Sequence, residues 1–273
     1  MKKHYLLTVA VGMGLLSLTT AVPSLVAQGN TSRDFEAPAV YQAAGPTRES
    51  IATTIDQFRA AIGGINNGNN AGTSGPGRRE INWDGGGSNT SPAATPFTGF
   101  LNIRGALFTT SGSGFVQAPP AGMATTFGNL SYETAFQAFS LQRLFSPVGS
   151  NVTDTTFFIP GSQGGTPATT AAFGAVFADV DQPDGSGPGS KRGNRGASTF
   201  IEYYGYAGNL LFSSYVAATP GTATFSFFGV VFNDARIGRV RITAGDLAPG
   251  PDDDPARDIV LMDDFLFGEP KQF

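Results

Sequence analysis

The sequence of 273 residues contains no cysteine, and its only histidine is His4, close to the N-terminus. Without cysteine no disulfide can stabilise the fold, so a hydrophobic core has to do so. Beyond His4 the chain has no Ser-His-Asp or Cys-His nucleophile system and no nitrogen or sulfur ligands for zinc. Carboxylate chemistry and hard cations such as Ca²⁺, which prefer oxygen ligands, remain available.

Positive charge is also scarce. The chain has 17 Lys and Arg residues against 21 Asp and Glu residues, a formal net charge of −4, and only four of the basic residues are lysines. An acidic chain of this kind is poorly suited to nucleic acid or to anionic lipid. No glycine-rich nucleotide-binding motif opens a helix after a strand. We therefore expect no nucleic-acid partner.

The N-terminus has the pattern of a signal peptide. Two lysines at the second and third positions precede an apolar run, Tyr5–Leu16, and small residues allow cleavage after Ala21 or Ala27. We predict a signal peptide over residues 1–27, a secreted or periplasmic protein, and no membrane insertion after cleavage. The alternative is an uncleaved membrane anchor, for which the run is short compared with the roughly 20 residues of a span.

One amphipathic helix is predicted, over residues 47–62. Ile51, Ile55 and Phe58 recur at helical spacing, and Gly63 and Gly64 end the pattern. We interpret this helix as a packing element that closes one end of the β domain. The alternative is a helix that binds a partner.

The rest of the chain falls into three segments that differ in amino-acid composition. Residues 28–46 are polar and expected to be poorly ordered, and residues 63–79 form a linker rich in Gly and Asn. Residues 80–273 predict short strands separated by Gly and Pro, with most of the 23 phenylalanines as core material. Because no helical pattern separates these strands, we expect an all-β fold, a two-sheet antiparallel jelly-roll sandwich with one N-terminal helix. The clearest strands are expected near residues 100–108, 152–159, 173–180, 199–204, 210–216, 222–232, 239–243 and 259–267.

The first candidate metal site follows a predicted strand. Asp179, Asp181 and Asp184 are spaced D-x-D-x-x-D-G, and short carboxylates at alternating positions can converge on one Ca²⁺ ion. A solvated, aspartate-rich turn explains the same pattern.

The second candidate metal site is Asp263 and Asp264 in the closing strand. Strict alternation puts Asp263 on one face with Leu261 and Phe265, where a carboxylate is costly unless it is paired, hydrogen-bonded or metal-bound. The alternative for Asp263 is a carboxylate that accepts hydrogen bonds from backbone amides or pairs with an arginine. Asp264, on the opposite face, lines a groove or meets water.

Aromatic residues beside hydrogen-bonding side chains indicate a sugar-binding surface. Trp83 is the only tryptophan and is followed by Asp84, while Tyr203 and Tyr206 flank a predicted hairpin turn. An exposed Trp83 would stack on sugar, with Tyr203 and Tyr206 as further platforms and Asp84 as a source of oxygen ligands. A buried Trp83 that anchors the first strand is the alternative, and for this residue it is the preferred interpretation.

Several blocks resemble uncharacterised secreted bacterial proteins. They are INWDGGG (81–87), RLFSPVGSN (143–151), GAVFADVD (174–181), STFIEYYGYAGNLL (198–211), FFGVVF (227–232) and VLMDDFLFGEP (260–270). The closing strand is also similar to the final strand of galactose-binding-like jelly rolls and MAM-type domains. That resemblance implies the jelly-roll fold and a structural Ca²⁺ near Asp263 and Asp264, and it implies no activity.

These observations favour an exported, non-catalytic β-sandwich that binds carbohydrate or another cell-surface polymer and contains a structural calcium ion. Two alternatives stay open. One is a polysaccharide-degrading enzyme built on paired carboxylates. The other is a structural matrix or surface-assembly protein whose glycine-rich strands pack edge to edge.

Overall fold

The structure, a computed structural model, describes residues 36–72, 75–181, 199–252 and 257–273. The predicted signal peptide and Asp184 lie outside the described residues.

The described part forms two sheets in which all strand pairings are antiparallel. The larger sheet has eight strands in the order β1 (Ala39–Gly45), β11 (Phe225–Val231), β8 (Ala172–Ala178), β13 (Leu261–Gly268), β6 (Leu144–Val148), β5 (Gly114–Ala118) and β3 (Ser91–Ala94), with β2 (Arg78–Ile81) pairing with β13. The smaller sheet has five strands in the order β10 (Leu210–Tyr215), β9 (Phe200–Gly205), β12 (Ile237–Thr243), β7 (Val152–Phe157) and β4 (Ala106–Thr109). The all-β sandwich prediction is confirmed at this level.

An aromatic core takes the place of disulfides. Trp83 is 1% exposed and stacks on Phe145, with ring centroids 3.7 Å apart and the rings nearly parallel. Phe108 and Phe265 meet the same indole edge to face, at 5.3 and 5.2 Å. Offset-stacked and edge-to-face rings of this kind are favourable beyond the apolar area they bury. Residues from both sheets contribute to this cluster, so it holds the two layers together.

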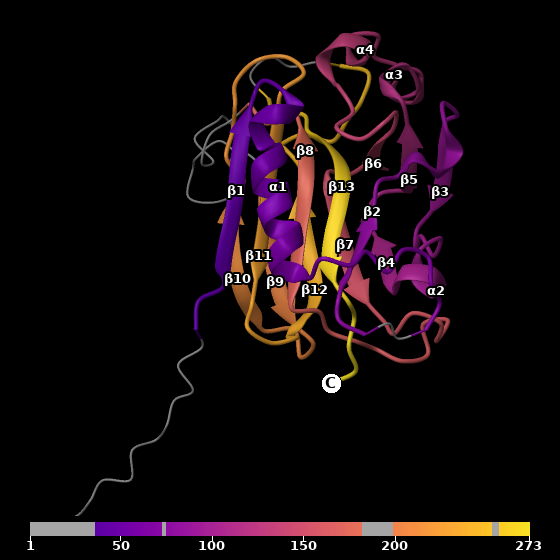
Figure 1. Cartoon of the computed structure of the whole chain (residues 1–273). Coiled ribbons are helices and arrows are strands. Elements are labelled where there is room, and N and C mark those ends of the chain that lie inside the picture. Colours follow the sequence, from indigo (N-terminus) through magenta and orange to yellow (C-terminus); the bar gives the residue numbers. More distant parts are fainter. Residues whose placement is uncertain (1–35, 73–74, 182–198, 253–256) are drawn as a thin grey trace, which may run out of the picture. The chain divides into compact units, whose positions relative to one another are not determined.

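Helix α1 (Arg48–Ile62) falls within the predicted range and packs on a sheet face. Thr47 forms a capping box with Ser50, and Ile51, Ile55 and Phe58 are fully buried. The helix contacts β1 and β11, so it lies across the outer face of the larger sheet, in front of it in Figure 1. It is a packing element, as expected, but it covers a face of the β domain and does not close an end.

Segment 28–46, expected to be poorly ordered, contains the edge strand β1. This strand pairs with β11 over its whole length, from Ala39–Val231 to Gly45–Phe225. Its outward residues are exposed, so its sequence lacks the apolar run that marks an inner strand. The expectation of disorder is therefore wrong for residues 39–45.

Three short helices lie between strands where none was predicted. Helices α3 (Pro120–Phe127) and α4 (Tyr132–Ala135) connect β5 to β6. Helix α2 (Leu101–Arg104) and a left-handed Gly105 (φ +73°) occupy most of the expected strand 100–108, of which only β4 remains. Each is too short for a full amphipathic pattern. Within the described residues, no helix has the length and apolar character needed to cross a membrane.

Strand β13 has eight residues, and all eight are buried. On one side it pairs with β8, and on the other with β6 at Met262 and with β2 from Phe265 onward. The register against β8 shifts between Met262 and Phe265, which is a β-bulge. As a result Met262 and Phe265 both face the inter-sheet core, and the predicted strict alternation of this strand is wrong.

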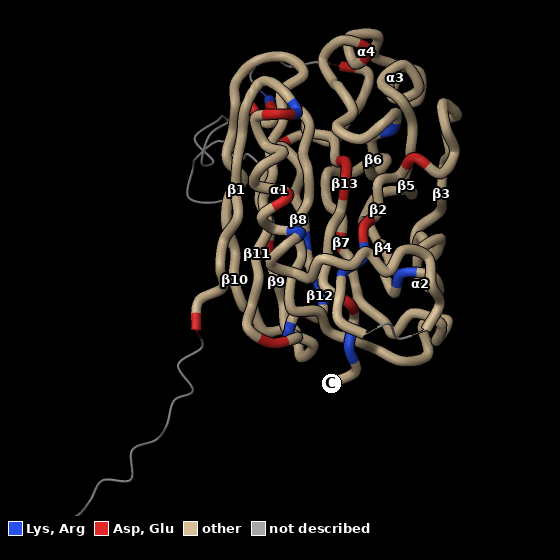
Figure 2. The backbone as a smooth tube through the Cα atoms, in the orientation of Figure 1, with Lys and Arg blue, Asp and Glu red and all other residues tan. Residues whose placement is uncertain are grey.

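A buried ion pair ties the linker to the end of β13. Arg79 in β2 is fully buried, and its Nε and Nη2 atoms donate to the two carboxylate oxygens of Glu269, at 2.6 and 2.7 Å. The same guanidinium donates to the carbonyls of Gly68, Asn70 and Ile103 at 2.8 to 2.9 Å. Figure 2 shows how basic and acidic positions are distributed along the chain, with acidic positions on β2 and β13. The arginine thus holds part of segment 63–79 against the sheet.

Substituting Glu269 with Gln should lower the free energy of unfolding strongly. The amide keeps the shape of the side chain but leaves the guanidinium of Arg79 buried without a countercharge, a change that costs about 3 to 5 kcal/mol in comparable pairs. Urea unfolding followed by circular dichroism measures the change. Glu133→Gln, at an exposed position of α4, is the control and should change stability little. Equal effects of the two substitutions would contradict a structural role for the pair.

Candidate functional sites

The carboxyl group of Asp263 lies at the β-bulge and is surrounded by donors. It is fully buried, the backbone amide of Phe139 donates to Oδ2 at 2.6 Å, and the Ser140 hydroxyl donates to Oδ1 at 3.0 Å. Burial, and then the charge of Asp264, raise the pKa of Asp263 well above its usual range. These contacts match the interpretation of Asp263 as an acceptor of backbone amides.

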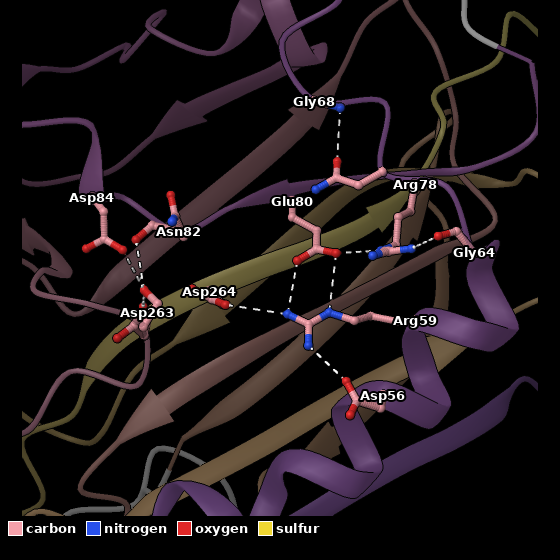
Figure 3. Close-up of polar contacts among 12 residues, drawn as sticks. Asp56, Arg59, Gly64, Gly68, Arg78, Glu80, Asn82, Asp84, Asp263 and Asp264 are labelled. Atoms are coloured by element: carbon pink, nitrogen blue, oxygen red, sulfur yellow. Dashed lines mark hydrogen bonds and ion pairs between the residues drawn. The ribbon is translucent and has the colours of Figure 1, made fainter.

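Asp264 points the other way, toward helix α1 (Figure 3). Its Oδ2 lies 3.9 Å from Nη2 of Arg59, and the same guanidinium donates to Glu80 at 3.0 and 3.3 Å. The Oδ1 atom of Asp264 is buried and has no hydrogen-bond partner among the described residues. Burial is the main cause that raises the pKa of Asp264 to about 6, and the charge of Arg59 opposes it.

Asp84 holds the segment that leads into β6. Its two carboxylate oxygens accept from the Ser140 hydroxyl and from the backbone amides of Leu141, Gln142 and Arg143, at 3.0 to 3.2 Å. Ser140 lies between Asp84 and Asp263 and contacts both carboxylates. The acceptor positions of Asp84 are therefore used within the fold, which does not support its predicted role as a ligand for sugar or metal.

A second group of acids lies where β8 ends. Asp179 follows that strand in the left-handed conformation (φ +69°), is 9% exposed, and has an Oδ1 atom without a partner in the described part of the chain. Burial raises the pKa of Asp179 to about 8, with smaller contributions from the charges of Asp181 and Asp258. The amide of Asp181 donates to Oδ1 of Asp258 at 3.3 Å.

This acidic group is not a preformed metal centre. Within residues 36–72, 75–181, 199–252 and 257–273, no three Asp, Glu, His or Cys side chains are arranged so that they hold a metal ion as they stand. The structure separates the predicted ligands into two places, Asp179 with Asp181 and Asp263 with Asp264, and it adds Asp258 to the first.

Two of the three predicted stacking platforms lie in the core. Trp83 is 1% exposed, and its Nε1 donates to the carbonyl of Asp263 at 2.9 Å. Tyr203 is fully buried and donates to the carbonyl of Phe173 at 3.2 Å. Their prediction as sugar-binding surfaces is wrong, because an aromatic ring in a core has no free face. Tyr206 is 58% exposed and packs against Phe273, with ring centroids 4.0 Å apart.

The outer face of the smaller sheet carries a row of polar side chains that sequence reasoning missed. Directly paired residues of antiparallel strands share a face, and the inner face is identified by buried residues such as Tyr203, Val240 and Thr155. One line of partners on the opposite face crosses all five strands. This polar row consists of Ser213, Glu202, Arg241, Asp154 and Thr109.

Ion pairs and aromatic rings order the polar row. Asp154 accepts from Arg241 at 2.8 and 3.0 Å and from the neighbouring Arg239 at 2.7 Å. The hydroxyl of Tyr204 donates to Glu202 at 3.0 Å, and the guanidinium of Arg239 lies 4.0 Å from the centroid of the Tyr204 ring. The side chain of Arg241 is 41% exposed. The row therefore presents the guanidinium of Arg241 to solvent, while Glu202 beside it is 9% exposed.

Aromatic residues border the row on both sides. Tyr204 lies two residues from Glu202 on the same face of β9, and Phe200 lies two residues away in the other direction, with its ring 4.7 Å from that of Tyr215. The signal in the sequence is the alternation in FIEYYG: once Tyr203 is assigned to the core, Glu202 and Tyr204 must face outward.

Comparisons with known proteins give no match. No family model matches the chain, and no similar protein was found among curated proteins or among solved structures.

The pH dependence of stability should reveal the buried carboxyl of Asp264. Its folded-state pKa of about 6 lies above the ordinary value. The unfolded chain therefore loses this proton first as the pH rises from 4, and stability falls until about pH 6. In Asp264→Asn this loss is absent, so the variant should gain on the order of 2 kcal/mol relative to wild type between pH 4 and pH 7.

Urea unfolding at several pH values measures this difference. Asp56→Asn is the matched control, because Asp56 contacts the same Arg59 but its side chain is 73% exposed. The gain of Asp264→Asn between pH 4 and pH 7 should exceed that of this control. A gain no larger than that of the control would contradict a raised pKa of Asp264.

Proposed function

We propose that this protein is a non-catalytic binding protein that acts outside the cytoplasm and holds a carbohydrate polymer against the outer face of its five-stranded sheet. The observation that carries the proposal is the polar row, an ordered line of donors and acceptors bordered by aromatic rings. Among the described residues, α1 contacts β1, β11 and β13 and α3 contacts β5, all in the larger sheet, while the short α2 contacts only the edge strand β4 of the smaller sheet among the stronger contacts.

The chemistry of this face suits sugar. Carbohydrate recognition needs planar hydrogen-bonding groups for hydroxyls and aromatic or apolar surface for the sugar ring. Arg241 and Arg239 supply the first, while the half-buried Tyr204 and Tyr215 supply the second. Neighbouring strands lie about 4.8 Å apart, so the five-stranded row is about 19 Å long. A surface of that length fits several units of an extended polymer better than a single small molecule.

The burial and the ion pairs of the acidic side chains favour binding over glycoside hydrolysis. A glycosidase needs a carboxyl with a raised pKa that reaches the substrate, opposite a second carboxylate. The carboxyls with the largest rise in pKa, Asp179 and Asp263, are 9% and 0% exposed. On the outer face, Asp154 is instead held by Arg239 and Arg241.

The proposal also includes predictions about export, about the strand connectivity and about the source of the carbohydrate. Export rests on the signal-peptide pattern of residues 1–27, which lie outside the described residues. The jelly-roll connectivity and the resemblance to secreted bacterial proteins stay predictions. A cell-surface polymer is the natural source of the carbohydrate for an exported protein.

Arg241→Ala should weaken binding of a polysaccharide by at least about tenfold, the effect of losing one interaction of about 1.4 kcal/mol at a central position. A glycan array selects the ligand, and titration calorimetry of the purified protein then measures the dissociation constant. Tyr204→Ala should have a similar effect, because it removes both a ring and the hydroxyl that contacts Glu202.

Arg48→Ala is the matched control. This arginine lies on α1, over the other sheet, and donates to the carbonyl of Ala138, so its loss should leave affinity unchanged. Unchanged affinity in both outer-face variants would contradict the proposed site. Release of reducing ends or unsaturated sugars from the same polysaccharides would contradict a non-catalytic role and support the enzymatic alternative.

A further inference from the structure

The acids at the end of β8 form a cluster with two buried carboxylate oxygens that lack a partner. These atoms are Oδ1 of Asp179 and Oδ2 of Asp246, both without a hydrogen bond among the described residues. Asp179 is 9% exposed and Asp246 is 5% exposed. An unpartnered buried carboxylate is costly in free energy unless a proton or a cation compensates it.

Hydrogen bonds hold the cluster together from three parts of the chain. The amide of Asp181 donates to Asp258 at 3.3 Å, and the amide of Asp258 donates to Oδ1 of Asp246 at 2.8 Å. The amide of Gly221 donates to Oδ1 of Asp181 at 2.9 Å. Three carboxylates, those of Asp181, Asp246 and Asp258, thus accept backbone amides, and an ion pair joins Arg257 to Asp246.

The backbone of Asp179 is adapted to this position. Its φ of +69° lies in the left-handed region, which aspartate and asparagine tolerate better than other non-glycine residues. The charges of Asp181 and Asp258 raise the pKa of Asp179 further after burial has done so. Like charges brought together in this way repel each other unless a proton or a cation compensates them.

We propose that Asp179, Asp181 and Asp258 bind a Ca²⁺ ion where strand β8 ends. Ca²⁺ takes six to eight oxygen ligands at flexible geometry and accepts backbone carbonyls and water beside carboxylates. The three side chains do not surround an ion as they stand, so binding turns the Asp181 and Asp258 carboxylates toward Oδ1 of Asp179. None of these residues belongs to the polar row, so this site is independent of the carbohydrate proposal.

Thermal unfolding of the full chain tests the site with Ca²⁺ itself as the probe. After treatment with EGTA and its removal, added CaCl₂ should raise the melting temperature until saturation. At a concentration about a hundredfold above the dissociation constant the rise should be about 5 to 10 °C, because an ion that binds only the folded state stabilises it. Calorimetric titration with CaCl₂ should give the same dissociation constant.

Asp179→Asn should abolish this rise. In EGTA its melting temperature should equal or exceed that of the wild type, because the amide tolerates the left-handed backbone and removes a repelled buried charge. Asp181→Asn, at a less buried position, should weaken the Ca²⁺ response while the protein stays folded. Asp234→Asn is the control. The Asp234 side chain is 61% exposed, pairs with the nearby Arg236 and is not a proposed ligand, so the rise in melting temperature with CaCl₂ should be the same as in the wild type.

Three results would overturn the proposal. One is a melting temperature that does not respond to CaCl₂, with no heat on titration. Another is a full response in both Asp179→Asn and Asp181→Asn, which would place the ion elsewhere. The third is an equal rise with MgCl₂ at the same ionic strength, which would indicate general screening of acidic charge and not a Ca²⁺ site.

Discussion

The burial of strand β13 is the constraint on which the rest of the structure depends. All eight of its residues are buried, so a polar group in it is costly in free energy unless it finds a partner inside the protein. The Asp263 carboxylate is satisfied by the segment around Ser140, and Glu269, just beyond the strand, is satisfied by Arg79. Both contacts bring in distant parts of the chain: the loop before β6 and the linker after α1. The closing strand therefore orders segments that have little regular structure of their own, which a chain without disulfides has to achieve through non-covalent contacts.

The two outer faces of the sandwich differ in what covers them. The larger sheet buries Val176, Phe227 and Leu266 under helix α1, so its outer face is a second core. The smaller sheet instead presents the polar row, in which the carboxylate of Asp154 is shared by Arg239 and Arg241. Arginine side chains paired in this way keep a fixed geometry while their outer edges remain exposed, which is the arrangement a binding surface requires. The proposed function rests on this difference between the faces.

Asp263 and Asp179 are both buried, but they have different roles because different groups surround their carboxylates. Asp263 accepts from an amide and a hydroxyl, so its oxygens are used in holding the fold. Asp179 has an oxygen without a hydrogen bond, and the charges of two further acids raise its pKa after burial does, so its surroundings favour a proton or a cation. The same residue type is therefore structural in one place and a candidate cation ligand in the other. Counting the acids in a motif does not separate these cases, whereas counting the donors around each oxygen does.

Local patterns in the sequence were sufficient for the features that depend on near neighbours. Helix α1 follows from the spacing of Ile51, Ile55 and Phe58, the β9–β10 hairpin follows from its glycine-rich turn, and the absence of cysteine made an apolar core necessary. Tertiary structure alone decided which face each strand presents to the core and which acids meet. The bulge in β13 reverses the alternation after Met262, and Asp181 and Asp258 are 77 residues apart in the chain. The physical reason is that an inserted residue and a strand pairing are set by the packing of the whole sandwich, and neither leaves a signal in the residues beside it.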